Sequence, residues 1–253
     1  MTSIQETSRP SRWIKVSLIV VAVTLMSLIF SPPLFRTLLF QAFNIPAGSM
    51  APTLLVGDYL FVSKYAYGYT HYSLPFSPRL FSGRIFGSAP LRGDVVVFRS
   101  PKDDSVDYIK RVVGLPGETI QMKLGLLYIN GTPVARQRLA NYVGSGDSCG
   151  SDPRAGIKRW REILPNGVSY ETLDCVDNGF YDNTNVYTVP DGHFFMLGDN
   201  RDNSTDSRVL SAMGYVPLEN IVGRAGLIFF SRSPGSTTAA SDVRSERIGL
   251  VVH

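Results

Sequence analysis

The sequence contains only two cysteines and three histidines in 253 residues. Two cysteines are too few for a disulfide scaffold, and neither their spacing nor the scattered histidines fit a zinc site, so no metal and no cofactor is expected. Charged side chains account for only 18% of the chain and hydrophobic ones for 44%. This balance excludes wholesale disorder and supplies the packed core of one good-sized domain or two small ones.

Most of the chain also lacks a surplus of either charge. Residues 1–36 carry four basic side chains against one acidic, whereas the remaining 217 residues carry 21 basic and 20 acidic. The net charge of +4 therefore belongs mostly to the N-terminal tail. A nucleic-acid-binding domain needs a concentrated basic face, so we expect no nucleic-acid partner.

One long run without charge lies between Lys15 and Arg36. Its 20 residues would form a helix of roughly 30 Å, about the thickness of the hydrocarbon core of a bilayer. Basic residues are more numerous before this run than after it, which favours a cytoplasmic N-terminus. The sequence therefore predicts a cytoplasmic tail at 1–15, a transmembrane anchor at 16–36 and an extracytoplasmic domain at 37–253.

A cleavable secretory signal is the alternative interpretation of this run, because such signals also place basic residues before an apolar stretch. The run is long for the apolar part of a signal peptide, and no pair of small residues at cleavage spacing directly follows Phe30. Pro32-Pro33 is expected to end or kink the helix. We therefore expect an uncleaved anchor whose strongest part is Val16–Phe30.

After residue 40 the pattern consists of short apolar runs separated by glycine, proline, asparagine and aspartate. It predicts a mainly β domain with antiparallel pairing, and Asn130-Gly131 is a strong hairpin signal. Tyr67–Leu91 and Asn141–Asp182 have the composition of insertions, and the tail Ser231–Glu246 that of a mobile segment. The candidate strands are Tyr59–Val62, Asp94–Arg99, Tyr108–Gly114, Thr119–Lys123, Leu126–Ile129, Val186–Val189, His193–Leu197 and Gly223–Phe230.

Ser49 lies in the segment Ile45–Thr53, next to Gly48 and between two prolines. A serine on such a stiff, sharply turning loop can present its hydroxyl and nearby backbone N–H groups to one point, the geometry that an acyl-transfer nucleophile requires. Glycine, serine and proline also occur together in ordinary turns. The segment alone leaves both interpretations open.

A serine nucleophile needs a base, and no histidine motif in the chain supports a catalytic triad. A lysine serves only if burial lowers its pKa, because near pKa 10.4 only about one amine in several thousand is neutral at pH 7. In Val106–Val113, period-two alternation puts Lys110 on an apolar face with Tyr108 and Val112. Lys110 is therefore the candidate base and Lys64 a second choice; the alternative is a lysine whose ammonium reaches solvent at the strand edge.

Many hydrogen-bonding side chains follow directly after the apolar strand Phe194–Leu197, in the segment Gly198–Arg208. The spacing of their oxygens does not fit a calcium loop. Asp–Arg pairs and local turns would explain the segment as a polar surface loop. It would equally suit a buried network that positions a catalytic amine.

Together these segments resemble the type I signal peptidases (leader peptidases), bacterial membrane-bound serine proteases with a Ser–Lys dyad. Four motifs in the family's order behind a membrane span are a specific signature, and the resemblance covers roughly residues 14–230. It implies an antiparallel β catalytic domain with a smaller inserted β subdomain at about 124–190. The matching segments are Ile45–Thr53 for the nucleophile motif, Arg92–Phe98 for the Arg-Gly-Asp strand, Tyr108–Glu118 for the lysine motif and Gly198–Arg208 for the final motif.

The resemblance implies a role for each of several polar residues. Ser49 would be the nucleophile and Lys110 its general base. Ser204 would hydrogen-bond the Lys110 amine and orient it, while Asp206 and Arg208 would brace the surrounding loop. The backbone N–H of Ser49 would supply part of the oxyanion hole.

One position departs from the family pattern. In the best-known members a serine or threonine stands two residues before the nucleophile, and its hydroxyl completes the oxyanion hole. Here the residue is Ala47, which has no hydroxyl. A slower enzyme or a substitute donor is therefore expected, since losing one such donor costs ~10²–10³ in turnover.

The family cleaves exported preproteins after small residues at the first and third positions before the scissile bond, as in Ala-x-Ala. The substrate would lie extended and add to the domain as a strand. Shallow apolar pockets would admit alanine and exclude bulky side chains. The residues that match the pocket walls are Phe43, Ile45, Met50, Leu54, Val97, Tyr108 and Ile109.

The resemblance also suggests a disulfide between Cys149 and Cys175. It implies a location in the bacterial inner (plasma) membrane, with the lipid bilayer and exported preproteins as partners and the catalytic domain in the periplasm. Two other functions stay open from the sequence. One is a dedicated peptidase of the same family that matures a pilin or a conjugation protein, and the other is a catalytically decayed, membrane-tethered β scaffold.

Overall fold

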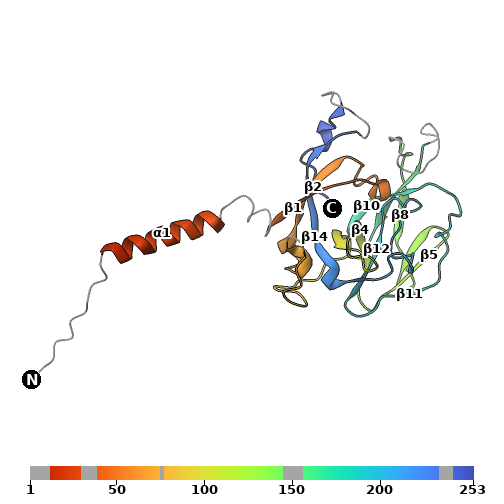
Figure 1. Cartoon of the computed structure of the whole chain (residues 1–253). Coiled ribbons are helices and arrows are strands. Elements are labelled where there is room, and N and C mark those ends of the chain that lie inside the picture. Colours follow the sequence, from red (N-terminus) through yellow and green to blue (C-terminus); the bar gives the residue numbers. More distant parts are fainter. Residues whose placement is uncertain (1–11, 30–38, 75–76, 145–155, 234–241) are drawn as a thin grey trace, which may run out of the picture.

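The computed structural model describes residues 12–29, 39–74, 77–144, 156–233 and 242–253 (Figure 1). Within these ranges the one α-helix is α1 (Arg12–Ile29), and everything else is built from strands, turns and 3-10 turns. The apolar side chains along α1 are exposed. The 3-10 turns are η1 (Gly48–Met50), η2 (Lys64–Ala66), η3 (His71–Ser73), η4 (Leu218–Asn220) and η6 (Ser245–Arg247).

The predicted transmembrane anchor at 16–36 is not confirmed. The helix begins at Arg12 rather than Val16 and ends at Ile29, so its 18 residues include the basic Arg12 and Lys15. No helix in the described part of the chain is both long and apolar enough to cross a membrane. The second half of the predicted anchor falls on residues outside the described ranges.

A seven-stranded sheet with antiparallel pairings forms the framework of the domain, in the order β1, β2, β14, β3, β4, β12, β13. The predicted mainly β, antiparallel class is confirmed. The strands are β1 (Phe40–Asn44), β2 (Asp58–Ser63), β3 (Val95–Arg99), β4 (Asp107–Gly114), β12 (His193–Leu197), β13 (Val216–Pro217) and β14 (Ile221–Ser231).

Two smaller antiparallel sheets lie between β4 and β12 in the chain, a stretch that overlaps the predicted insertion at about 124–190. One joins β11 (Tyr187–Thr188), β5 (Thr119–Lys123), β6 (Leu126–Ile129) and β7 (Thr132–Pro133). The other joins β10 (Ser169–Asp174), β9 (Lys158–Ile163) and β8 (Ala135–Arg138). Asn130 and Gly131 connect β6 to β7 with φ of 50° and 75°, so the predicted hairpin is confirmed with the left-handed backbone such a turn needs.

The segment Asn141–Asp182, expected to be polar and turn-rich, also contains the paired strands β9 and β10, which are not among the candidate strands. These strands are polar, and they are held by six register pairs and by charges across the strands. Arg161 stands opposite Glu171, and their side chains form an ion pair at 3.4 Å. Cross-strand pairs of this kind stabilise a sheet without an alternating apolar pattern in either strand.

The hydrophobic core divides along the two faces of the seven-stranded sheet. In β3, Val95 and Val97 pack in one cluster, whereas Val96 and Phe98 pack in another. β4 alternates in the same way, because Ile109 joins the first cluster and both Tyr108 and Val112 join the second. The Lys110 Nζ lies 5.5 Å from the centroid of the Tyr108 ring. The predicted alternation around Lys110 is therefore confirmed.

Residues near the C-terminus form hydrogen bonds to β2 and to the loop after Ser49. Arg247 and Arg244 donate to the fully buried carboxylate of Asp58 at 2.6 and 3.3 Å. Arg247 also donates to the Thr53 carbonyl at 3.0 Å. The predicted mobility of Ser231–Glu246 is thus wrong at Arg244, because a buried carboxylate requires a cationic partner. Residues 234–241 lie outside the described ranges.

Candidate active site

Ser49 lies on a single tight turn that is anchored in the core. A hydrogen bond from the Ala51 N–H to the Gly48 carbonyl, at 3.1 Å, closes η1 around it. The Met50 side chain next to Ser49 is fully buried. Ser49 itself is only half-buried. The turn therefore holds a serine hydroxyl at the surface on a rigid base.

Lys110 reaches this hydroxyl from β4. Its Nζ lies 2.7 Å from the Ser49 Oγ and 2.9 Å from the carbonyl oxygen of Ile109. The lysine is only 3% exposed, and this burial lowers the pKa of its amine to about 8, although Asp206 and Asp199 act in the opposite direction. A neutral amine at this distance can accept the proton of the serine hydroxyl, so the two side chains have the geometry of a nucleophile and its base.

An unpaired strand edge runs beside the two side chains. The antiparallel register between β12 and β4 begins at the pair Leu197–Arg111 and continues away from Lys110. Within the described residues, no strand pairs with the Asp107–Lys110 part of that edge. An extended peptide bound there would complete the ladder and pass the Ser49 hydroxyl.

The segment after β12 packs against the back of the Ser49 turn. A Cβ at Gly198 would lie 2.6 Å from the Ser49 carbonyl oxygen, which is closer than such an atom can approach. Asn200, fully buried, donates from its backbone N–H to the Ser49 carbonyl and from its Nδ2 to the Gly48 carbonyl, both at 3.1 Å. The glycine thus allows the contact and the asparagine satisfies both carbonyls.

A buried ion pair supports the same segment. The Arg111 guanidinium is fully buried and binds Asp199 through two hydrogen bonds of 2.8 and 2.7 Å. Asp199 also accepts a hydrogen bond of 2.5 Å from the Thr53 hydroxyl. Burial alone would lower the pKa of Arg111, but the Asp199 charge outweighs it and raises the pKa. The pair therefore connects β4, which carries Lys110, to the segment after β12, and Thr53 connects that segment to the Ser49 loop.

The signal peptidase family, peptidase S26, matches residues 11–230 of the chain. The chain belongs to this family. A signal peptidase I of Rickettsia typhi is 45% identical over 206 residues, which cover 78% of this chain and 74% of the relative. One of Rickettsia conorii is 45% identical over 208 residues, with the same coverage. A crystal structure of a signal peptidase I from Enterococcus faecalis V583 is 27% identical and covers 54% of this chain and 97% of its own, at a TM-score of 0.32.

Family membership and this level of identity give the activity. The chain has signal peptidase I activity, which makes it a serine endopeptidase that processes signal peptides of preprotein substrates.

Ser204 does not make the hydrogen bond expected of it. The two hydrogen bonds of the Lys110 amine go to Ser49 and Ile109. The Ser204 Oγ is buried; it helps to lower the pKa of Asp206, but it has no hydrogen-bond partner of normal geometry within the described residues. Its role in orienting the Lys110 amine therefore stays a prediction.

Asp206 and Arg208 form a buried pair on this loop. Arg208 donates to both carboxylate oxygens of Asp206 at 2.8 Å, and the Gly198 N–H donates to the same carboxylate at 3.1 Å. Burial would raise the pKa of Asp206, yet Arg208 and these hydrogen bonds lower it. The geometry agrees with a bracing role, because the pair links the two ends of the loop.

Six of the seven expected pocket residues come together on one face of the sheet, and Tyr108 packs on the other. Phe43 and Ile109 are partly buried, whereas Met50 and Leu54 are inaccessible. Fully buried side chains shape a pocket from behind rather than line it. The six residues are Phe43, Ile45, Met50, Leu54, Val97 and Ile109.

Lys64, the second candidate base, lies away from the dyad. Lys64 is buried, and its Nζ donates to the Ser73 carbonyl at 2.6 Å. Burial lowers its pKa, but its amine lies against η3 and not against Ser49. Cys175 is disulfide-bonded. Its expected partner Cys149 lies outside the described residues, so that pairing stays a prediction.

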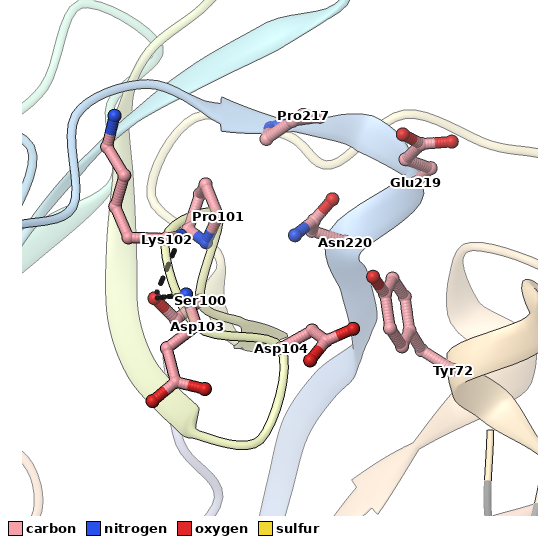
Figure 2. Close-up of a pocket in the computed structure, with 9 residues that line it drawn as sticks. All are labelled: Tyr72, Ser100, Pro101, Lys102, Asp103, Asp104, Pro217, Glu219 and Asn220. Carbon is pink, nitrogen blue, oxygen red and sulfur yellow. Dashed lines mark hydrogen bonds between the residues drawn. The ribbon is translucent and has the colours of Figure 1, made fainter.

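An open pocket of about 500 Å³ lies between the β3–β4 turn and η4 and contains neither Ser49 nor Lys110. Figure 2 shows Asn220, Asp104 and Tyr72 around its opening. Asn220 donates to the Arg99 carbonyl at 2.9 Å, and the Ser100 hydroxyl accepts from two backbone N–H groups. The pocket is therefore separate from the active site, and the hydrogen bonds of Asn220 and Ser100 stabilise the local turns.

Sequence reasoning did not identify Thr53, Asp199 and Asn200, although all three lie in motifs that it selected. For Asp199 and Asn200 the signal was the density of polar residues after an apolar strand, whereas Thr53 carried none beyond its place at the end of the Ser49 segment. Which of these side chains turn inward is decided by the fold, because the loop has no periodicity that would separate an inner from an outer face.

Proposed function

We propose that Ser49 and Lys110 are the catalytic dyad of this peptidase. The supporting observation is the 2.7 Å contact between the Lys110 Nζ and the Ser49 Oγ at a buried amine. The neutral amine takes the hydroxyl proton while the Oγ attacks the scissile carbonyl, and the resulting ammonium gives that proton to the leaving amine. The same amine then deprotonates a water, whose hydroxide attacks the Ser49 ester, and the resulting ammonium gives its proton to the departing Oγ.

The oxyanion of the tetrahedral intermediate is proposed to bind the Ser49 N–H. This N–H makes no hydrogen bond within the described residues, so it is available to a developing negative charge. Ala47, two residues earlier, is exposed and offers no hydroxyl. The oxyanion hole thus lacks the side-chain donor found in the best-known relatives.

Replacing Ala47 with serine is expected to increase kcat by ~10-fold or more. An added donor of this kind is worth up to ~10²–10³ in turnover when it is well placed. Steady-state kinetics on a preprotein, with Ala140→Ser as the matched control, measures the effect. An unchanged or lower kcat would show that the hole is already complete.

The proposed substrates are exported preproteins with small residues before the cleavage site. Bound as a strand along the free edge of β4, a signal peptide would place alternate side chains toward Phe43 and Ile109. Cleavage after Ala-x-Ala, and loss of cleavage when the residue before the scissile bond becomes leucine, is the expected specificity.

We also propose that the enzyme works at the bacterial inner membrane with its N-terminus in the cytoplasm and its catalytic domain outside. The exposed apolar side chains of α1, among them Leu18, Ile19, Leu25 and Leu28, would be covered by lipid. Membrane fractionation of the full chain should recover it in the carbonate-resistant pellet. Recovery in the supernatant would contradict this location.

The direct test of the proposed function uses purified full chain and several unrelated preproteins. Ser49→Ala is expected to lower kcat/KM by ~10⁴ or more, as loss of a serine nucleophile does in other serine proteases. The exposed Ser211→Ala is the matched control and should cleave normally. Normal cleavage by Ser49→Ala would contradict the dyad, and cleavage of one preprotein alone would indicate a dedicated maturation peptidase.

A further inference from the structure

We infer that Asn200 is a positioning residue that fixes the direction of the Ser49 N–H. This inference rests on the proposed function, because it concerns the donor that binds the oxyanion. It assigns a role to a side chain that touches neither substrate nor the reacting atoms. Two hydrogen bonds and the planarity of the peptide group fix that direction.

Asn200 holds two of the three carbonyls of the nucleophile turn, those of Gly48 and Ser49. The Asn200 Nδ2 donates to the Gly48 carbonyl, and the Asn200 N–H donates to the Ser49 carbonyl, each at 3.1 Å. Asn200 is fully buried, so water does not compete for either bond. Within the turn itself, one 3-10 hydrogen bond, from the Ala51 N–H to the Gly48 carbonyl, also holds the Gly48 peptide unit, and such bonds have poorer geometry than α-helical ones.

Planarity links the first of these bonds to catalysis. The carbonyl of Gly48 and the N–H of Ser49 belong to the same trans peptide unit, in which the two bonds point in opposite directions. Holding the carbonyl inward with Asn200 therefore turns the N–H outward, toward the side where substrate binds. If this peptide unit rotated, the oxyanion would lose its donor while the Ser49 Oγ could stay near Lys110.

The segment that carries Asn200 is itself fixed by the inserted three-stranded sheet. The N–H of Leu173, in β10, donates to the Asp199 carbonyl, and the Arg201 N–H donates to the Leu173 carbonyl, both at 2.9 Å. The Asp202 carboxylate accepts the N–H of Cys175 at 2.7 Å. The residues before and after Asn200 are thus hydrogen-bonded to Leu173 in β10, which suits a residue that must hold another in place.

The absence of a hydroxyl at Ala47 increases the importance of this contact. With one side-chain donor fewer, the Ser49 N–H carries a larger share of the oxyanion stabilisation. A loss of its orientation should therefore affect kcat more here than in a relative with a complete hole. Substrate binding along β4 should be unaffected, because Asn200 lies behind the turn.

The test compares Asn200→Asp and Asn200→Ala with wild type and with the exposed Asn185→Asp as the matched control. Asn200→Asp keeps the shape of the side chain and removes its donor. We expect kcat to fall by ~10–100-fold in both variants, with KM within about twofold. The pH midpoint of the rate should be unchanged in the uncharged Asn200→Ala variant, whereas a nearby carboxylate in Asn200→Asp would raise the pKa of Lys110 as Asp206 and Asp199 do. Asn185→Asp should match wild type.

A peptide aldehyde ending in alanine provides a readout that a general loosening of the site would not give. Its adduct with Ser49 places an oxyanion at the Ser49 N–H, whereas the corresponding peptide alcohol forms no adduct. The aldehyde should bind the Asn200 variants ~10–100-fold more weakly, and the alcohol should bind as it does to wild type.

Three results would overturn the inference: an unchanged kcat, equal weakening of aldehyde and alcohol, or unfolding of both variants at the assay temperature. Wild type and Ser49→Ala in the same assay separate this inference from the proposed function. If wild type cleaves, Ser49→Ala does not, and Asn200→Asp cleaves normally, only the role of Asn200 is wrong. If wild type and Ser49→Ala behave alike, the dyad itself is wrong.

Discussion

Lys110→Met is expected to lower kcat/KM by ~10⁴ or more and, at neutral pH, to make the protein more stable. The loss of activity follows from removing the base that activates Ser49, since removing one member of a coupled catalytic unit disables the whole unit. The gain in stability follows from removing a charge that is 97% shielded from solvent, because Lys110 is only 3% exposed. Methionine has a similar length and no charge to desolvate.

The size and pH range of the gain follow from the pKa of Lys110. Burial lowers this pKa from 10.5 to about 8. At about 1.4 kcal/mol for each pKa unit, this corresponds to roughly 3–4 kcal/mol, an upper value for the gain at pH 7. Between pH about 8 and 10.5 the unfolded chain binds a proton that the folded chain does not, so wild-type stability rises with pH there. The methionine variant should lack this rise.

Denaturant unfolding at pH 7 and above pH 10, with Lys102→Met as the control at an exposed lysine, measures both effects. We expect the variant to be more stable than wild type at pH 7, with the difference shrinking at the higher pH. A variant less stable than wild type at pH 7 would indicate that Lys110 is held charged by its neighbours and is no base.

Asp199→Asn is expected to destabilise the protein by about 3–5 kcal/mol, the usual result of breaking a buried ion pair from one side. The substitution leaves the Arg111 guanidinium, which is fully buried, without its counter-charge. The amide keeps the volume of the carboxylate, so packing changes contribute little. The Thr53 hydroxyl also loses its carboxylate acceptor, and kcat should fall because Thr53 follows the nucleophile turn.

The free energy of unfolding of Asp199→Asn, measured by urea titration, tests this expectation, and the exposed Asp191→Asn is the control. Asp191→Asn should lie within ~0.5 kcal/mol of wild type. An Asp199→Asn variant as stable as wild type would show that the Arg111 charge is compensated elsewhere, for example by the carbonyls of Gly93 and His253 that it also contacts.

Much of the fold was predictable because local signals and tertiary structure agree in its apolar strands. β5, β6 and β12 have the predicted bounds, and β4 differs from its prediction by one residue. The alternation that singled out Lys110 is visible in the sequence, since a strand has period two whatever it packs against. The dyad pairing of Ser49 with Lys110 needed the family resemblance, because the two residues are 61 positions apart.

Other features depend on contacts that no local pattern encodes. β9 and β10 are polar and are stabilised by each other across the pairing. Arg244 lies in the Ser/Thr/Ala-rich tail Ser231–Glu246 and Arg247 directly follows it, and their partner Asp58 is nearly 190 residues away. Asn200 is one of several polar residues in its loop, and only the fold selects it as the one that faces Ser49.

The central claim is that a neutral Lys110 removes the proton from Ser49, and the pH dependence of kcat/KM tests it most directly. For cleavage of an Ala-x-Ala preprotein by the full chain, kcat/KM should rise about tenfold per pH unit below the pKa and level off above a midpoint of about 8. A value of kcat/KM that stays constant through this range would contradict the claim.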